Sequence, residues 1–178
     1  DAEKVISPEL KFEGNKLYLI KHTPLDNYMP DVEQLKANWA YVNEQIEAEN
    51  IVSGYALGFG GIAEAICKMS FGNGLDAKIN VDEKELFNYG YGSILVEAEG
   101  ELDYPNAVLV GEVTDGEDSE LTINGVKFDL FDLMAANSAK FAQVYPDTAE
   151  AYCKDVVPAG LEGVKPFKAK KADLKYKG

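Results

Sequence analysis

Six of the 16 glycines in this chain lie between Ser53 and Gly74. Three of them, Gly58, Gly60 and Gly61, form a predicted turn between an apolar run and a helical pattern. Glycine permits positive φ angles and a close approach of the backbone to a ligand. A glycine turn that opens a helix presents free N–H groups at the positive end of the helix dipole, where anions bind. Gly58, Gly60 and Gly61 are therefore candidates for a nucleotide-facing turn. A tight turn that lays the helix flat on a sheet is an equally good interpretation.

The turn does not match the common phosphate-binding signatures. It reads Gly58-Phe59-Gly60-Gly61-Ile62-Ala63, which fits neither GxxxxGK[ST] nor GxGxxG. Glu64 follows in the first helical turn and could act as a base. A glutamate at a helix start more often complements the helix dipole, so this structural role is the expected one.

Other residues capable of chemistry show little pattern. A single histidine at the end of a strand, His22, is more often a surface residue or a satisfied hydrogen-bonding partner than a general acid. Ser70, Ser93 and Ser138 lack the histidine pattern of a serine nucleophile. The acidic run 115–118 lacks the alternating ligands of a calcium loop. The sequence therefore assigns no catalytic residue and no metal ligand.

Charge and composition restrict the possible partners. The formal net charge is −14, which disfavours nucleic acid, and all 17 basic residues are lysines. Without arginine, the chain cannot clamp a phosphate through a bidentate guanidinium. Cys67, Cys153 and His22 form neither a zinc spacing nor a disulfide framework, which favours a cytoplasmic location. No apolar run reaches the roughly 18 residues of a membrane span, so no membrane partner is expected.

Hydrophobic periodicity predicts alternating strands and helices. Leu35, Trp39, Val42 and Ile46 recur at helical spacing and predict one face of an amphipathic helix that Asp31 caps and that runs to about Asn50. The other predicted elements are strands at 16–21, 51–55, 75–81, 92–99 and 107–113, a hairpin at 119–129 that turns at Asn124-Gly125, and helices at 62–71, 82–87, 130–145 and 147–154. The short connections between the late strands predict an α+β fold, a mixed sheet flanked by helices.

The end of the chain differs in character. Six of the 17 lysines fall after residue 164. This run predicts a solvated, lysine-rich linker or tail over residues 161–178, which follows one domain over residues 1–160.

Several blocks resemble the carboxy-terminal domain of the aminoimidazole ribonucleotide synthase superfamily. The run SGYALGFGGIAEAICKMSFGNG is similar to that family's strand, glycine turn and helix, and LFNYGYGSI is similar to the short helix that leads into its central strand. The blocks KLYLIKHTPLDNYMPDVEQLK and FDLMAANSAKFAQVYP look like the long single-chain phosphoribosylformylglycinamidine synthases within it. The resemblance spans about residues 5–160, and the lysine-rich end resembles the linker before their glutaminase domain.

This resemblance implies a fragment of a purine-biosynthesis ligase. Such an enzyme converts formylglycinamide ribonucleotide, ATP and glutamine to formylglycinamidine ribonucleotide, ADP, phosphate and glutamate. It implies ATP and magnesium as cofactors of the parent enzyme. It also implies sister synthase domains and a glutaminase domain of the same chain as partners. The fragment by itself is expected to be inactive because those domains complete the active site.

The resemblance fails at the metal-binding positions of the turn. Family members that bind a nucleotide there have an acidic residue and a hydroxyl ahead of the Gly-Gly pair. This chain has Ala56, Gly58 and Phe59, which offer no side-chain oxygen to magnesium. We therefore expect a degenerate, mainly structural half in which no cofactor is firmly bound. Two alternatives stay open: another superfamily member, such as an aminoimidazole ribonucleotide synthase or a selenophosphate synthase relative, and a non-catalytic interaction module.

Overall fold

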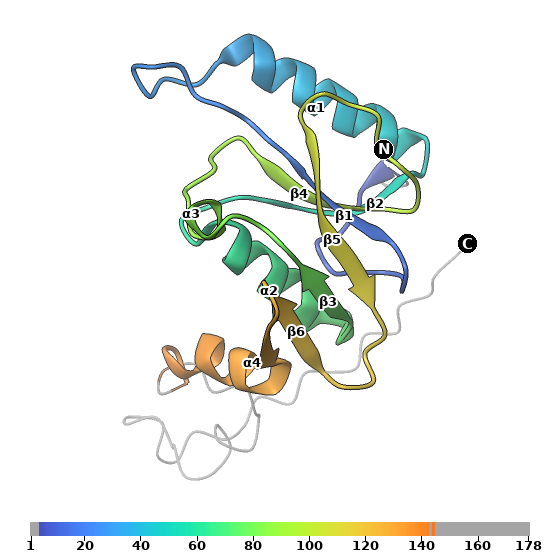
Figure 1. Ribbon diagram of the computed structural model, residues 1–178, viewed down its shortest axis with the longest axis vertical. Helices are drawn as coiled ribbons and strands as arrows, with labels where there is room; N and C mark the ends of the chain where they lie inside the picture. Colours follow the sequence, from blue (N-terminus) through green and yellow to red (C-terminus); the bar gives the residue numbers. More distant parts are fainter. Residues whose placement is uncertain (1–3, 143, 145–178) are drawn as a thin grey trace, which may run out of the picture. The chain divides into compact units, whose positions relative to one another are not determined.

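The computed structural model describes residues 4–142 and residue 144, and in them seven strands form one mixed sheet (Figure 1). The strand order is β2-β4-β1-β5-β3-β6-β7, and of the paired neighbours only β3 and β6 run parallel. The strands are β1 Lys16–Ile20, β2 Ile51–Ala56, β3 Asp76–Ile79, β4 Ile94–Ala98, β5 Ala107–Thr114, β6 Glu120–Ile123 and β7 Val126–Asp129. The helices are α1 Val32–Glu47, α2 Gly61–Asn73, α3 Glu83–Leu86 and α4 Leu130–Ala139. The predicted α+β class is confirmed.

The sheet separates two apolar cores, because alternate residues of a strand point to opposite faces. Leu17 and Leu19 of β1 join the larger cluster, which α2 covers with Ile62, Ile66 and Met69. On the other face, Tyr18 and Ile20 join a smaller cluster that contains Val42 of α1. Strand β1 is therefore a central strand buried on both sides, which explains its nearly continuous apolar sequence.

Local signals in the sequence set most element boundaries. Asp31 accepts hydrogen bonds from the N–H groups of Glu33 and Gln34 and caps α1. Gly74 ends α2 with a left-handed φ of 64°. Asn124 and Gly125 both have positive φ, 51° and 81°, as the predicted hairpin turn between β6 and β7 requires.

The predicted buried face of α1 is partly wrong. Trp39 is 52% exposed, whereas its neighbour Asn38 is fully buried. Asn38 donates to the carbonyl oxygen of Lys21 and accepts from the hydroxyl of Tyr104 and the amide of Asn106. Because these three bonds satisfy the polar side chain, Asn38 rather than Trp39 faces the sheet.

Helix α4 is shorter than predicted, and the later elements lie outside the described residues. The helix ends at Ala139, where the N–H groups of Phe141 and Ala142 donate to the carbonyl oxygen of Ser138 and close a turn. The chain divides into two compact units, residues 1–137 and 138–178, and the sheet belongs to the first. The predicted helix at 147–154, the boundary at 160 and the lysine-rich tail at 161–178 lie outside the described part. Over the described residues, no helix combines the length and apolarity that crossing a membrane requires.

A buried carboxylate fastens the segment before β1 to the sheet. Glu97 of β4 is fully buried. Its Oε1 accepts from the backbone N–H of Phe12 and the side chain of Asn15. Its Oε2 accepts from the backbone N–H of Lys11 and the hydroxyl of Ser53. Four donors around one carboxylate make this cluster a structural anchor.

Candidate functional site

The glycine turn occupies the corner between β2 and α2. Leu57 still pairs with the sheet edge, since its N–H donates to the carbonyl oxygen of Ser93 at 2.9 Å. Gly60 is the N-cap of α2 and, having no side chain, makes no side-chain capping hydrogen bond. The predicted strand-to-helix turn at Gly58, Gly60 and Gly61 is therefore present.

The three candidate glycines differ in how strictly their surroundings require glycine. Gly61 has a φ of +63°, and an added Cβ would lie 2.6 Å from the carbonyl oxygen of Asn88 and 2.8 Å from that of Leu86. At Gly60, an added Cβ would lie 2.4 Å from the Cβ of Glu64. At Gly58, the nearest atom would be a Glu64 oxygen at 3.8 Å, an ordinary contact. Gly61 is thus required because the start of α2 packs directly against the 86–88 backbone.

The side chain of Glu64 folds back over this turn. Its Oε2 accepts the backbone N–H of Gly60 at 2.9 Å, and its Oε1 accepts from the ammonium of Lys68 at 2.6 Å. The hydrogen bond from Lys68, followed by that from Gly60, lowers the pKa of the Glu64 carboxyl. A chain carboxylate therefore occupies the position that an anionic ligand of the Gly60 amide would take, as the dipole interpretation of Glu64 predicted.

The turn does not fit a magnesium nucleotide. The N–H groups of Ile62 and Ala63 have no acceptor among the described residues, so the helix start keeps some positive character. A phosphate that approached them would meet the negative Glu64 carboxylate in the same helical turn. Ala56, Gly58 and Phe59 provide no side-chain oxygen for a metal.

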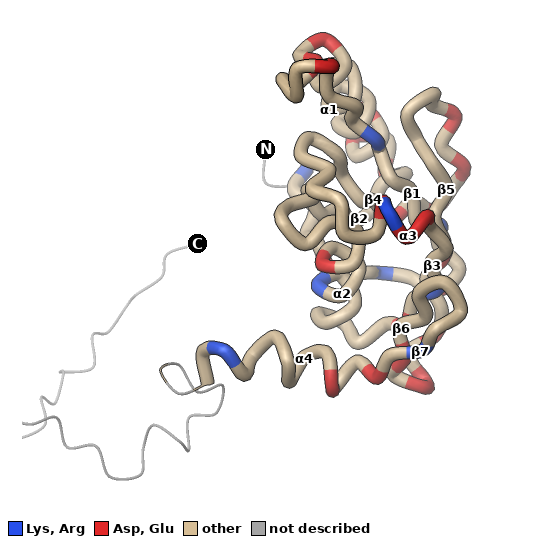
Figure 2. Tube along the Cα trace, turned by 60° about the vertical axis from the view of Figure 1, so that its left-hand side comes forward, with Lys and Arg blue, Asp and Glu red and all other residues tan. Residues whose placement is uncertain are grey.

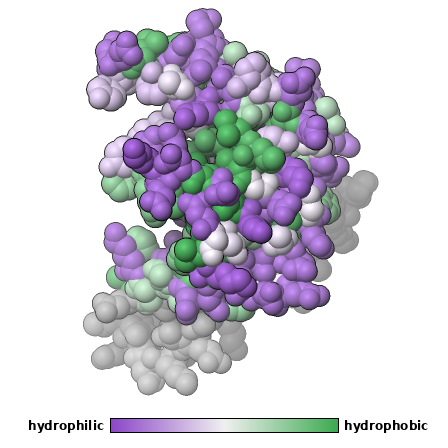
Figure 3. All heavy atoms as spheres, in the orientation of Figure 1, coloured by the Kyte–Doolittle hydropathy of each residue, from purple (hydrophilic) through white to green (hydrophobic). Residues whose placement is uncertain are grey.

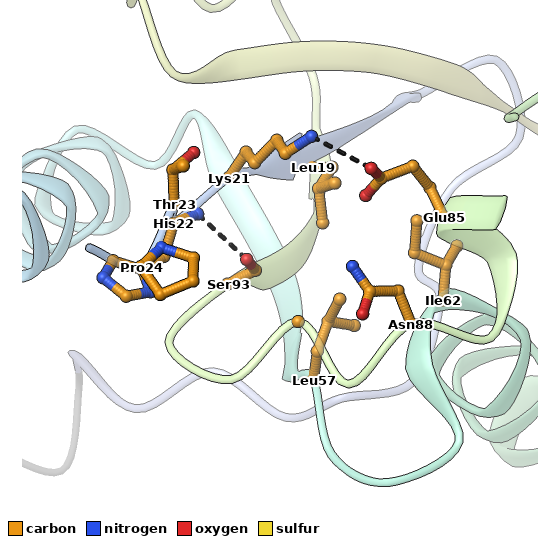
Figure 4. A pocket seen from close by; sticks show the side chains of 11 residues that line it. Leu19, Lys21, His22, Thr23, Pro24, Leu57, Ile62, Glu85, Asn88 and Ser93 are labelled. Carbon is orange, nitrogen blue, oxygen red and sulfur yellow. Dashed lines mark hydrogen bonds and ion pairs between the residues drawn. The ribbon is translucent and has the colours of Figure 1, made fainter. Parts of the chain in front are cut away.

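A small pocket adjoins the turn, at the edge where β1 ends and β4 begins (Figure 4). Its volume is about 180 Å³, below the roughly 300 Å³ at which ordinary small-ligand pockets begin. Apolar side chains of Leu19, Leu57 and Ile62 line one part. Lys21 and Glu85 face each other across it at 3.3 Å. The pocket is thus suited to a small polar group rather than to a whole nucleotide.

His22 also lines the pocket, and its role there is structural. It is 5% exposed, and its Nδ1 lies 3.0 Å from the carbonyl oxygen of Tyr91. Its Nε2 accepts the backbone N–H of Asp31 at 3.2 Å. These bonds require a neutral ring with the proton on Nδ1. Both ring nitrogens are thus bonded to other groups. The hydroxyl oxygen of Ser93 accepts the backbone N–H of His22 instead, so the pair is not arranged as nucleophile and base.

The remaining charged residues of the described part of the chain form no second candidate centre. No group of three or more His, Cys, Asp or Glu side chains in the described part of the chain is arranged to hold a metal ion. Burial raises the pKa of the Cys67 thiol, which disfavours the reactive thiolate. Over the described residues, Figure 2 shows lysines interspersed with acidic residues rather than joined in one basic stripe.

Sequence reasoning named Phe59 only as a departure from the family's metal-binding positions, and it missed the residues that surround the turn. Lys21, Glu85 and Asn88 line the pocket, and Phe59, Tyr89 and Tyr91 form an exposed aromatic cluster beside the turn. The available signal was the run LFNYGYG, in which two tyrosines alternate with glycines. That signal indicates exposed rings on a tight loop, but not which other loop they contact.

No protein-family model matches the sequence, and no curated protein is significantly similar to it. Solved structures do share its fold. Phosphoribosylformylglycinamidine synthase II from Thermotoga maritima matches with a TM-score of 0.58 at 11% identity, over 72% of this chain and 27% of that one. The T. maritima protein PurL complexed with ATP matches with a TM-score of 0.55 at 11% identity, over 72% and 27%. HypE, a hydrogenase maturation protein from E. coli, matches with a TM-score of 0.52 at 14% identity, over 70% and 52%.

These similarities establish the fold and not the activity. The mixed seven-stranded sheet flanked by helices is shared with these solved structures. The chain spans only about a quarter of the Thermotoga enzyme's length.

Proposed function

We propose that this chain is the carboxy-terminal synthase domain of a formylglycinamidine ribonucleotide synthase, and that it is a degenerate, mainly structural half. The sequence blocks and the shared fold support the parentage. The single observation that carries the degenerate assignment is the hydrogen bond between the Gly60 amide and the Glu64 carboxylate. This bond places the negative charge of Glu64 where a phosphate would otherwise bind.

In this proposal the chemistry belongs to the parent enzyme. ATP activates the amide oxygen of the formylglycinamide substrate, and ammonia that the glutaminase releases from glutamine displaces the activated oxygen. This chain contributes no catalytic residue. Its role is to pack against sister synthase domains and the glutaminase domain of the same polypeptide, in the cytoplasm.

Calorimetric titration of the chain with ATP and Mg²⁺ tests the degenerate assignment. We expect no measurable heat of binding. Micromolar binding that disappears in Gly60→Val and survives in Gly58→Ala would contradict it. Gly58→Ala is the matched control, because its added methyl group meets no atom closer than 3.8 Å.

Two other candidates each have a specific observation in their favour. The match to E. coli HypE supports a different member of the same superfamily. Exposed apolar side chains support a pure interaction module: Val108 and Leu109 of β5 are 46% and 56% exposed, and Figure 3 shows apolar residues gathered within a mostly polar face. The second candidate is compatible with the main proposal, since a degenerate half would serve as a scaffold.

A further inference from the structure

Three exposed aromatic rings, Phe59, Tyr89 and Tyr91, form a contiguous cluster that we name the aromatic triad. The rings of Phe59 and Tyr89 stack with centroids 4.9 Å apart and planes 22° apart. The rings of Tyr89 and Tyr91 lie 6.2 Å apart at 40°. The three residues remain 74%, 52% and 60% exposed. Clustered exposed aromatics are typical of binding surfaces, because aromatic side chains dominate interface energetics.

The backbone holds the triad in place from both sides. Gly61 and the 86–88 backbone are in direct contact, which joins the loop of Phe59 to that of Tyr89. Gly92 has a φ of +87°, and an added Cβ would lie 2.5 Å from Leu35. The buried ring of His22 bonds to the carbonyl oxygen of Tyr91. A partner would therefore meet loops whose backbone is already held, so little backbone entropy is lost on binding.

The surroundings of the triad are acidic. Helix α3 directly precedes Phe87 and Tyr89. Lys21 pairs with Glu85 of this helix, and of the other charges around it Asp82 and Glu83 outnumber Lys84. The whole chain carries a net charge of −14 and contains no arginine. The cation–π contact of the described residues is made by Lys68 over Tyr55, so the triad's open ring faces have no cation of their own there. Open aromatic faces in a negative field favour a cation that can also stack.

We propose that the aromatic triad docks arginine side chains of a basic polypeptide surface. A guanidinium is planar, weakly hydrated and permanently charged, so it stacks on tyrosine and phenylalanine better than an ammonium does. Acidic residues of α3 add long-range attraction for the same partner. This inference goes beyond the proposed function and needs no nucleotide, so its test is independent of the ATP titration.

Calorimetry with two peptides of equal charge, hexa-arginine and hexa-lysine, separates stacking from simple charge attraction. At about 0.15 M salt, where exposed charges are partly screened, we expect the full chain to bind hexa-arginine about fivefold more tightly than hexa-lysine. In the variant Phe59→Ala/Tyr89→Ala/Tyr91→Ala, this ratio should fall to about one while the hexa-lysine affinity stays unchanged. Equal affinity for both peptides in the wild type, or no binding of either, overturns the inference.

A matched control uses exposed rings elsewhere. Tyr28 is 90% exposed and Trp39 is 52% exposed, and neither belongs to the triad. Tyr28→Ala/Trp39→Ala should keep the fivefold preference, and a loss of preference there would overturn the assignment to the triad. Circular dichroism checks that the triple variant is folded. If it is not folded, the single variant Phe59→Leu takes its place in the test. Leucine keeps apolar volume but removes one aromatic ring, so it should lower the preference for hexa-arginine over hexa-lysine.

Discussion

The carboxylate of Glu64 accepts the backbone N–H of Gly60 at 2.9 Å and the ammonium of Lys68 at 2.6 Å. One side chain thereby caps the start of α2, forms an ion pair along the helix and places a negative charge over the glycine turn. The start of α2 is thus stabilised from within the chain. The same contact makes the turn a poor site for phosphate.

Replacing Glu64 should weaken the fold modestly. Glu64→Ala removes the cap and the ion pair and should lower the free energy of unfolding by about 1 kcal/mol. Glu64→Gln keeps an oxygen for the Gly60 N–H and should lose roughly half as much. Urea denaturation of both variants measures the difference. An unchanged stability in Glu64→Ala would show that the cap contributes nothing.

The contribution of Glu64 should depend on pH. Its carboxyl has a lowered pKa in the folded protein, chiefly because of Lys68. The stabilisation is therefore present above the unfolded value of about 4.3 and is lost as the pH falls through the lower folded value. The difference in free energy of unfolding between wild type and Glu64→Gln should therefore vanish below the folded pKa of Glu64. Urea denaturation at several pH values measures this difference.

Two glycines of the turn, Gly61 and Gly58, should differ sharply in how well they tolerate replacement by alanine. Gly61→Ala places a methyl group against two backbone carbonyl oxygens at a positive φ and should cost at least about 2 kcal/mol of stability. Gly58→Ala should change stability by less than about 0.5 kcal/mol, because its surroundings are open. Thermal unfolding of the two variants gives the comparison. Equal losses would contradict the packing role of Gly61.

The buried anchor at Glu97 should be intolerant even of an isosteric change. In Glu97→Gln, either orientation of the amide points its NH2 group at a backbone N–H that cannot accept, that of Phe12 or that of Lys11. We expect a loss of about 3 kcal/mol. Glu99→Gln, at an exposed neighbouring position, is the control and should stay within about 0.5 kcal/mol. Chemical denaturation reports both.

Asp76 should show the opposite pH behaviour. Burial raises the pKa of its carboxyl, and the nearby charges of Asp115 and Asp118 raise it further. The folded protein therefore disfavours the ionised form at neutral pH, and stability is gained as the pH falls through the raised folded value. Asp76→Asn keeps an acceptor for the Glu120 N–H, which bonds to Asp76 at 2.9 Å. It should stabilise the protein at pH 7, with the gain vanishing below the unfolded value of about 3.9. Exposed Asp26→Asn is the control and should show no comparable gain.

Local chemistry allowed much of this fold to be predicted. Asp31 and Asn124-Gly125 act through bonds or dihedral angles within a few residues of themselves, so the sequence alone determined where α1 begins and where the hairpin turns. Strand and helix order followed from periodicity, and with it the mixed-sheet class. The glycine turn and the role of Glu64 at the helix start could also be predicted, because both depend on residues close together in the sequence.

Tertiary structure decided the rest, because those contacts join residues that are distant in sequence. Asn38 replaces Trp39 in the core only because Tyr104 and Asn106 reach it from beyond β4. The sequence showed that Gly61 lies at a tight turn, but only the fold placed it against the 86–88 backbone and brought Phe59 onto Tyr89. Propensities act along the chain, whereas packing and hydrogen-bond satisfaction act across it, and the latter determine what this turn can bind.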